Sequence, residues 1–244
     1  MHADDVDVVL VRPSRPANVA AACRAMKNMG LRSLRLVGGG GVDRAEDRAL
    51  AYGAWDVLDG AERHATLAEA LAASTFVAGT SGRSDPAAWT PRRLAEEAAA
   101  RAGGGRIALV FGPESHGLSA AELRLCHVVV HVPTDPSHSS LNLAQAVLIL
   151  AYEVRLSGRG AGGPSPAPAD QATVQEVEPC LDALRQALLS VGYLNPQDPG
   201  HILSELRSLL ARAGVTRREL TLLRGIARQM QWAGSVASRS RGGG

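Results

Sequence analysis

The sequence predicts an α/β domain with a mostly parallel sheet, followed by a small domain of α-helices. Over residues 6–156, short β-rich runs alternate with helical patterns. The β-rich runs are almost entirely apolar, which is typical of strands that parallel sheets bury on both faces. Residues 157–172 are rich in glycine, proline and small polar residues, a composition that favours a flexible linker between the two domains.

Five strands are expected in the first domain, at residues 6–11, 33–37, 75–79, 107–112 and 127–132. Helices are expected at 16–30 and 91–102. In the first helix, the spacing predicts a core-facing stripe of Val19, Ala22, Met26 and Met29. The opposite face should carry the remaining small and polar positions, Ala17, Ala20, Ala21, Arg24 and Asn28.

The segment 141–154 is apolar on nearly every side of a helix. That exceeds the single stripe that a surface helix of a monomer needs, so the pattern predicts burial against a second subunit. Ser139, Ser140 and Asn142 precede it, and their oxygens can accept hydrogen bonds from the free N–H groups of the first turn. For Ser140, a simple helix cap is therefore the alternative to a functional role.

Three further helices are expected, at 173–191, 199–213 and 216–232, within a helical extension spanning 173–234. Residues 235–244 are expected to form a disordered tail. Residues 201–244 contain eight arginines and two glutamates, whereas the formal charge of the whole chain is only +2. This asymmetry favours contact with a polyanion such as RNA, although a solvated helix surface would look the same. The arginines expected on the outside are Arg207, Arg217, Arg218, Arg224 and Arg228.

Several classes of protein are disfavoured. No charged and apolar leader precedes the first strand, and no apolar run reaches the roughly 18 residues of a membrane span, so we expect a cytoplasmic protein without a membrane partner. Three dispersed cysteines offer neither a disulfide framework nor a metal knuckle, and we expect no metal. The glycines at 38–41 lack the lysine of a phosphate-binding loop, and no dinucleotide-binding fingerprint is present.

Three polar segments could carry chemistry: RPSRPANVAAACRAMKNMG at 12–30, LVFGPESHGLS at 109–119 and VPTDPSHSSLNLAQAV at 132–147. The first offers Arg24 and Asn28 one helical turn apart above small alanines, which suits RNA phosphate or a partner subunit. The second follows a buried strand, and ligands of open α/β sheets bind beyond the carboxyl ends of strands. Its glycines would allow a ligand to approach closely, although a tight turn without a ligand is the alternative.

In order and spacing, these segments resemble the three motifs of the SpoU branch of SPOUT methyltransferases. The wording AxRAMKNMG and SSLNLAQAV is especially similar to tRNA 2'-O-methyltransferases of that branch, and GYLNP at 192–196 with ELTLLRGIARQMQW at 219–232 resembles their helical extension. The resemblance implies a deep trefoil knot in the 1–156 domain, S-adenosyl-L-methionine as cofactor, a homodimer through the 141–154 helix, and transfer of a methyl group to a ribose 2'-hydroxyl of tRNA. An anticodon-loop cytidine or uridine is the expected target, with ribosomal RNA or a catalytically silent RNA-binding dimer as alternatives.

The resemblance also implies site residues. Motif matching assigns catalytic roles to Asn18, Arg24, Glu114, Ser140 and Asn142. Because a guanidinium resists deprotonation, we expect Arg24 to orient phosphate and stabilise developing alkoxide. The base stays open; His116 or His138 could relay a proton. The implied cofactor-binding residues come from three loops: Thr80, Ser81, Gly82, Gly112, Pro113, Glu114, Gly117, Val132, Pro133, Ser139, Ser140 and Leu141.

The RNA-binding set adds Arg15 and Lys27 to the five arginines of the extension. Two positions depart from the family pattern. Ala17 replaces a usual glycine, which is a small change, whereas Pro113 stands where relatives commonly place arginine or asparagine. Proline removes a backbone N–H and a side-chain donor, so Pro113 bears on the choice of substrate more than on the type of reaction.

Overall fold

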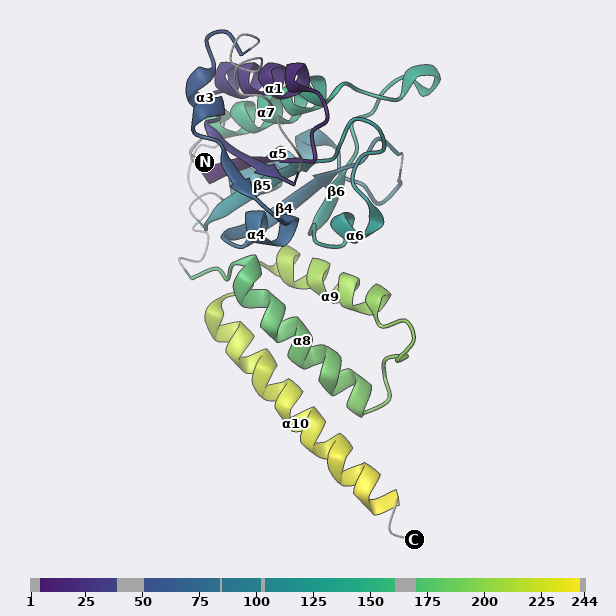
Figure 1. The fold of residues 1–244 in the computed structure, drawn as a ribbon. Helices are drawn as coiled ribbons and strands as arrows, with labels where there is room; N and C mark the ends of the chain where they lie inside the picture. The colour runs from purple at the N-terminus through teal and green to yellow at the C-terminus, as the bar shows by residue number, and fades with distance from the viewer. Residues whose placement is uncertain (1–4, 39–50, 84, 102–103, 161–169, 242–244) are drawn as a thin grey trace. The chain divides into compact units, whose positions relative to one another are not determined.

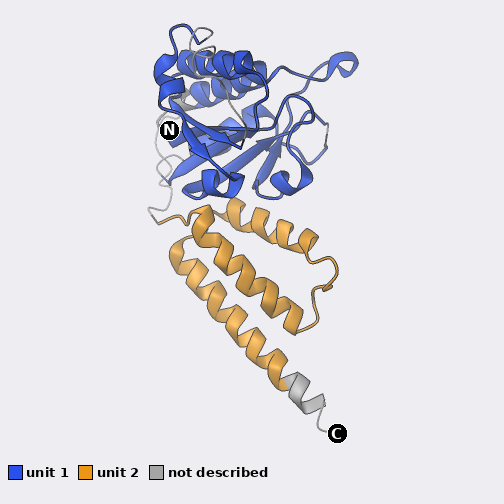
Figure 2. Ribbon diagram, viewed as in Figure 1, with its two compact units in different colours: residues 1–169 blue, residues 170–244 orange. Residues whose placement is uncertain are grey.

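The computed structural model describes residues 5–38, 51–83, 85–101, 104–160 and 170–241. The chain divides into two compact units, residues 1–169 and 170–244 (Figure 2). Unit 1 is the expected α/β domain and unit 2 is the expected helical domain. The fold class predicted from the sequence is therefore confirmed, and each unit is described by itself below.

Unit 1 is built on a six-stranded sheet in the order β3-β2-β1-β5-β4-β6, and every pair of neighbouring strands is parallel. In β1, Val8 pairs with Leu34 on one side and Leu109 on the other. The strands are β1 (Val6–Val11), β2 (Ser33–Val37), β3 (Glu62–His64), β4 (Ser74–Thr80), β5 (Arg106–Phe111) and β6 (Val128–Val130). The strand β3 was not predicted, because this short edge strand consists of polar residues and lacks an apolar run.

Helices cover both faces of this sheet. Figure 1 shows α1, α5 and α7 over one face and α4 and α6 on the other. An apolar core that includes Met26, Phe76, Phe111 and Leu150 lies under the first group. Among the residues of unit 1 that the structure describes, the helices are α1 (Pro16–Met29), α3 (Trp55–Asp59), α4 (Leu67–Leu71), α5 (Pro91–Ala100), α6 (Ala120–Leu123), the 3₁₀ turn η2 (Pro136–His138) and α7 (Leu143–Gly160).

Helix α1 confirms most of the predicted amphipathic pattern, with one correction. Val19, Ala22 and Met26 are buried as expected, and Arg24 is exposed, but Ala20 is fully buried rather than facing outward. The reason is that α1 packs against α7 and α3 as well as the sheet, so its buried sector is wider than one stripe.

Helix α7 buries one side within this chain, through Leu143, Val147, Leu150, Ala151 and Val154. The other side carries Leu148, Tyr152 and Leu156, which are 39%, 48% and 42% exposed and recur every fourth residue. The predicted burial on all sides is thus not met by one chain alone. A partner on the exposed stripe remains a prediction.

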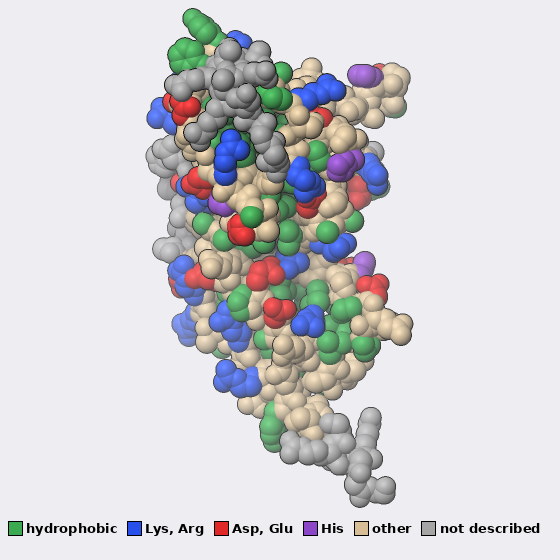
Figure 3. All heavy atoms as spheres, in the orientation of Figure 1, with side chains coloured by type: hydrophobic (Ala, Val, Ile, Leu, Met, Phe, Trp, Pro, Cys, Tyr) green, Lys and Arg blue, Asp and Glu red, His purple; other side chains and the backbone are tan. Residues whose placement is uncertain are grey.

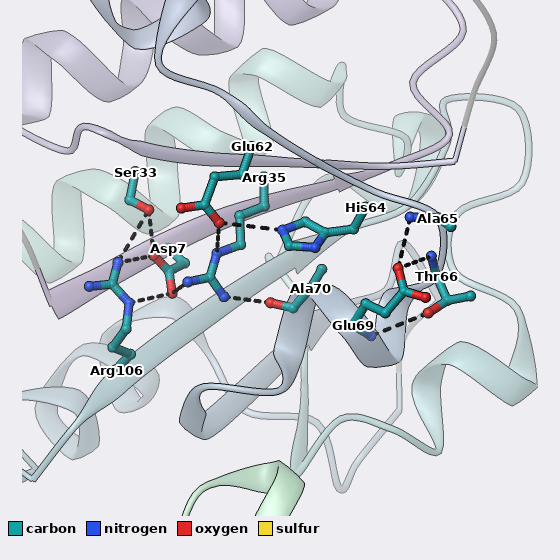
Figure 4. A network of polar contacts seen from close by, with 10 residues as sticks. All are labelled: Asp7, Ser33, Arg35, Glu62, His64, Ala65, Thr66, Glu69, Ala70 and Arg106. Carbon is teal, nitrogen blue, oxygen red and sulfur yellow. Dashed lines mark hydrogen bonds and ion pairs between the residues drawn. The ribbon is translucent and has the colours of Figure 1, made fainter.

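A buried charge cluster ties the amino-terminal parts of the strands together (Figure 4). Asp7 of β1 is fully buried; it accepts hydrogen bonds from Arg106 and from the Ser33 hydroxyl at 2.5 Å, and forms an ion pair with Arg35 at 3.1 Å. Arg35 also donates to the carbonyl of Ala70 in α4 at 2.5 Å. The cluster therefore joins β1, β2 and β5 to the helix on that face.

Unit 2 consists of α8 (Val174–Ser190), α9 (Gly200–Ala213) and α10 (Arg217–Arg241). Cys180, Leu181, Leu210 and Leu220 belong to its own small core.

Two predicted boundaries differ from the structure. Helix α7 continues through 157–160, where the linker was expected to begin, and α10 continues through 235–241, where a disordered tail was expected. No proline interrupts either stretch, so the helix can propagate. Residues 161–169 of the expected linker lie outside the described residues.

Candidate active site

The parallel sheet places the carboxyl ends of β1, β4, β5 and β6 at one edge, where the three polar segments of the sequence begin. Glu114, in the loop after β5, lies at their centre. Its Oε2 accepts hydrogen bonds from the backbone N–H of Ser14 at 3.0 Å and from the Ser14 hydroxyl at 2.9 Å, and its Oε1 accepts one from Asn18 Nδ2 at 2.6 Å. The first two motifs are therefore joined directly.

Asn142 adds the third motif to this cluster. Its Nδ2 donates to Asn18 Oδ1 at 2.9 Å, while its own Oδ1 accepts from the backbone N–H of Ala144 at 2.9 Å. Asn142 thus caps the first turn of α7 and orients Asn18 at the same time. Ser140 lies two residues before the cap, so the alternative of Ser140 as the helix cap is wrong.

Burial alone would raise the pKa of the Glu114 carboxyl, but the hydrogen bonds from Asn18 and Ser14 outweigh it and lower that pKa to about 2. All three donors are uncharged groups. The carboxylate consequently remains ionised and keeps its negative charge without a bonded cation.

A pocket of about 470 Å³ opens beside the cluster. It is lined by residues of all three motifs, namely Ser14, Arg15, Asn18, Glu114, Ser115, His138, Ser140, Leu141, Asn142, Leu143 and Gln145. Of the five predicted catalytic residues, the structure brings Asn18, Glu114, Ser140 and Asn142 to this pocket. Arg24 lies exposed on α1 and does not line it.

The loop after β5 has a fixed shape. At Gly112, an added Cβ would lie 2.2 Å from the backbone of Gly117 and Leu118, so the loop crosses itself there. The chain's own backbone fills the space beside this glycine, so a side chain there would break the tight turn, and contact of the Gly112 backbone with a cofactor stays a prediction. Gly117 has a φ of 69° and an added Cβ would meet nothing within 4 Å, so it faces open space.

A second anchor holds this loop to the first motif. Arg12, with a left-handed φ of 45°, forms an ion pair with Glu122 of α6 at 2.6 Å. Glu122 also accepts hydrogen bonds from the backbone N–H and hydroxyl of Ser119, each at 2.8 Å, and so caps α6. The turn at 12–14 thus contacts Glu114 in the loop and Glu122 in the helix that follows it.

The remaining predicted cofactor residues lie at the same edge. The Thr80 hydroxyl donates to the carbonyl of Val110 at 3.0 Å, and the Ser81 backbone N–H donates to the carbonyl of Val130 at 2.9 Å. These bonds fix the start of the 79–83 loop against its two neighbours. An added Cβ at Gly82 would meet nothing within 4 Å, and Leu141 is half-buried at the pocket.

The predicted RNA-binding residues divide into two groups. Arg15 lines the pocket, and Arg218 and Arg228 are exposed. Lys27, by contrast, is paired with Asp56 at 2.6 Å. The other arginines hold unit 2 together: Arg207 binds Glu178, Arg217 binds Asp170 and Glu176, and Arg224 donates to the carbonyl of Glu176.

Sequence reasoning missed Ser14, Ser115 and Gln145 at the pocket and Arg12 behind it. For Ser14 a signal existed, because it lies between the end of a strand and the start of a helix at the ligand-binding edge. Gln145 accepts a hydrogen bond from the Asn142 backbone N–H at 3.0 Å, which is the contact made by the N3 residue of a capping box.

Across the described ranges, no group of three or more His, Cys, Asp or Glu is arranged for a metal ion, and no helix is long and apolar enough to cross a membrane.

A parallel sheet with a pocket that three loops form at its carboxyl edge fits an α/β transferase of the SPOUT type. Residues 5–152 match the model of the SpoU rRNA Methylase family, and residues 175–242 match that of the tRNA methyltransferase TrmJ C-terminal domain. This chain belongs to the SpoU methylase family, and it is an RNA ribose methyltransferase that uses S-adenosylmethionine.

Individual relatives cover both units. The tRNA (cytidine/uridine/adenosine-2'-O-)-methyltransferase TrmJ of Pseudomonas aeruginosa is 39% identical over 93% of this chain and 94% of its own. The crystal structure of TrmJ from Z. mobilis covers 92% of this chain and 98% of its own, with a TM-score of 0.76 and 33% identity. A structure concerned with 2-OH methylation of C/U34 on tRNA covers 65% of this chain and 99% of its own, with a TM-score of 0.53 and 26% identity.

Proposed function

We propose that this protein methylates the ribose 2'-hydroxyl of a cytidine or uridine in the anticodon loop of tRNA. The observation that carries the proposal is the hydrogen-bonded cluster of Asn18, Glu114 and Asn142, one residue from each motif, beside a single pocket. The TrmJ relatives, which match along both units, supply the substrate class. Ribosomal RNA stays the nearest alternative substrate.

The residues present fit S-adenosylmethionine. The carboxylate of Glu114, bonded only by uncharged donors, leaves a negative charge that complements a cationic sulfonium or amino group. Gly82 and Gly117 leave open space beside two of the loops. We assign cofactor binding to the loops at 79–83, 111–117 and 132–142; when bound there, the cofactor supplies an electrophilic methyl group.

Each motif has a role in this proposal. Glu114 fixes the relative positions of the first two loops, and Asn142 fixes Asn18 to the start of α7. Ser140 is exposed at the pocket, where its hydroxyl can bind the ribose or the cofactor. Arg24 lies outside the pocket of its own chain, so we assign it to orienting the RNA phosphate, a role that an exposed guanidinium can fill without losing its proton.

A homodimer through α7 is part of the proposal. The exposed stripe of Leu148, Tyr152 and Leu156 is continuous along one side of the helix, and such a face favours a protein partner. α1, which packs beside α7, carries the exposed small residues Ala17 and Ala21, which would let another backbone approach closely. We also expect the trefoil knot of the family in unit 1.

In unit 2, fewer arginines are available for RNA binding than its composition suggested, because several of them are paired with carboxylates. On the face in Figure 3, its Arg side chains lie among acidic and hydrophobic ones rather than in one continuous patch. We assign phosphate contacts to the exposed Arg218 and Arg228, and we assign the paired Arg207 and Arg217 to the fold of the unit. A tRNA substrate would place the enzyme in the cytoplasm.

The test is methylation of bulk tRNA from a bacterial strain that lacks its own TrmJ, with labelled S-adenosylmethionine. Digestion and mass spectrometry of the nucleosides should show 2'-O-methylcytidine or 2'-O-methyluridine, absent with Arg24→Ala protein. Labelling of ribosomal RNA but not of tRNA would show that ribosomal RNA is the substrate. Tight tRNA binding without any methylation would identify a silent RNA-binding dimer.

A further inference from the structure

We propose that Ser115 and His116 form a proton relay that removes the proton from the ribose 2'-hydroxyl. The inference rests on the proposed function and assigns its missing base. Ser115 lines the pocket, and its Oγ lies 2.7 Å from Nδ1 of His116 in the same loop. Both side chains are exposed, so substrate can reach the serine and solvent can reach the histidine.

The reaction needs such a group, because a ribose hydroxyl is a poor nucleophile until its proton has somewhere to go. The other charged groups at the pocket do not serve. Arg15 is a cation and accepts no proton. Glu114 has a pKa lowered to about 2, and both of its oxygens already accept hydrogen bonds from Ser14 and Asn18, so it is too weak a base.

The loop holds the pair in place. Glu114, the residue before Ser115, is anchored to the first motif, and the crossing at Gly112 closes the loop on Gly117 and Leu118. Ser115 and His116 therefore lie between two fixed points. A general base acts well only when its position is fixed before the reaction, and this loop provides that.

His138 is the competing imidazole at the pocket. It ends the 3₁₀ turn η2 in the loop between β6 and α7, and its backbone N–H donates to the Asp135 carbonyl at 3.0 Å. Within the described ranges, its ring makes no hydrogen bond that would orient it. The ring of His116, by contrast, is already oriented by its contact with Ser115 Oγ.

The ribose O–H proton passes to Ser115 Oγ while the Ser115 hydroxyl proton passes to His116 Nδ1, in the tautomer that carries its hydrogen on Nε2. The ribose oxygen forms its bond to the methyl carbon, and the electron pair of the broken carbon–sulfur bond stays on sulfur, which becomes a neutral thioether. The exposed imidazolium then releases the proton to solvent.

The first test compares pH–rate profiles of tRNA methylation for wild-type, Ser115→Ala, His116→Gln and His138→Gln proteins. We expect the wild-type kcat to fall on the acidic side of a transition, because protonation of the relay imidazole removes the base. Ser115→Ala and His116→Gln should lower kcat roughly 100-fold on the alkaline side and remove that transition. His138→Gln should keep the transition. If His138→Gln removes it and His116→Gln does not, the relay is wrong.

The second test needs no substrate. Imidazole ¹⁵N NMR of the free enzyme should show His116 with an unprotonated, hydrogen-bonded Nδ1 at alkaline pH, and Ser115→Ala should change the Nδ1 shift of His116 but not that of His138. An unchanged His116 signal would overturn the relay. If wild-type protein methylates no tRNA, the proposed function fails; if it does and His116→Gln keeps the full rate and profile, only the relay fails.

Discussion

Two polar clusters lie at opposite ends of the same sheet, and they are built in different ways. At the amino end, Asp7 is fully buried between the guanidinium groups of Arg35 and Arg106 (Figure 4). At the carboxyl end, Glu114 is half-buried at a pocket and bonded by uncharged donors, Ser14 and Asn18. One carboxylate is neutralised by cations, and the other keeps its charge for whatever enters the pocket.

This difference indicates that the Asp7 cluster stabilises the fold, whereas the Glu114 cluster serves the chemistry of the pocket. A charge deep in the protein is tolerated only when a counter-charge and hydrogen bonds replace water, so the Asp7 cluster is committed to the fold. The Glu114 cluster joins three loops rather than strands, and its charge is left for a ligand. The first cluster should thus matter to unfolding and the second to catalysis.

The largest effect is expected from breaking the buried cluster. Asp7→Asn would leave Arg35 and Arg106 facing a neutral amide, and the free energy of unfolding should fall by about 3–5 kcal/mol. Urea unfolding followed by circular dichroism measures this. The matched control is Asp56→Asn, which breaks the exposed pair with Lys27 and should leave the unfolding midpoint unchanged. Equal effects of the two variants would contradict the structural role of Asp7.

Next comes the loss of charge at the pocket. In Glu114→Gln, the new amide N–H groups would face the donors of Ser14 or Asn18, and kcat/KM for tRNA methylation should fall roughly 100-fold. Glu96→Gln, an exposed carboxylate on α5, should keep full activity. The claim fails if the Glu114 variant methylates at the wild-type rate.

The same variant tests the depressed pKa. Because the folded-state pKa of Glu114 is lowered from 4.5 to about 2, the carboxylate stabilises the fold above its unfolded pKa, and this stabilisation is lost as pH falls. The stability difference between wild-type and Glu114→Gln proteins should be constant above about pH 5 and shrink between about pH 4.5 and 2. Urea unfolding at a series of pH values measures it, and a difference independent of pH would count against the assignment.

A smaller effect is expected behind the pocket. Arg12→Ala removes the ion pair with Glu122, and the free energy of unfolding should fall by about 1 kcal/mol. Because this pair fixes the loop next to Glu114, KM for S-adenosylmethionine should rise several-fold while kcat changes less. Arg12→Glu with Glu122→Arg should restore part of that KM. No recovery in the double variant would show that the pair does not position the loop.

The smallest effect concerns RNA binding by unit 2. Arg228→Ala should weaken tRNA binding a few-fold and lower the salt dependence of binding by about one phosphate contact. Arg217→Ala should mainly lower the stability of unit 2, because Arg217 is paired with Asp170 and Glu176. Filter binding at several salt concentrations separates the two. If both variants lose tRNA affinity equally, the assignment of Arg228 to RNA binding and of Arg217 to the fold of unit 2 is wrong.

Much of this could be predicted from the sequence. Strands buried on both faces read as apolar runs, so five of the six were found near their true bounds, and the parallel sheet rule placed three motifs at one edge. The sequence could not show that Arg207 and Arg217 meet carboxylates, because those pairs depend on how α8 packs against its neighbours. Ala20 was misplaced for a related reason, since α7 covers a flank of α1 that periodicity alone leaves open.

The site followed the same division. Asn18, Glu114, Ser140 and Asn142 were identified from motifs, whereas their hydrogen bonds depend on loop conformations that spacing does not encode. The Arg12–Glu122 pair is the clearest case, because it needs a left-handed residue before a proline. Within the apolar run VDVVLV, the single Asp7 was a signal of a buried counter-charge.

The central claim is that Asn18, Glu114 and Asn142 act as one unit in methyl transfer to tRNA. The most direct measurement is a double-mutant cycle on kcat/KM with Asn18→Ala, Asn142→Ala and the double variant, each checked to be folded at the assay temperature. The account predicts that the double variant loses about as much activity as either single variant, because either change breaks the same cluster. Losses that simply multiply would show that the two residues act independently, and would contradict it.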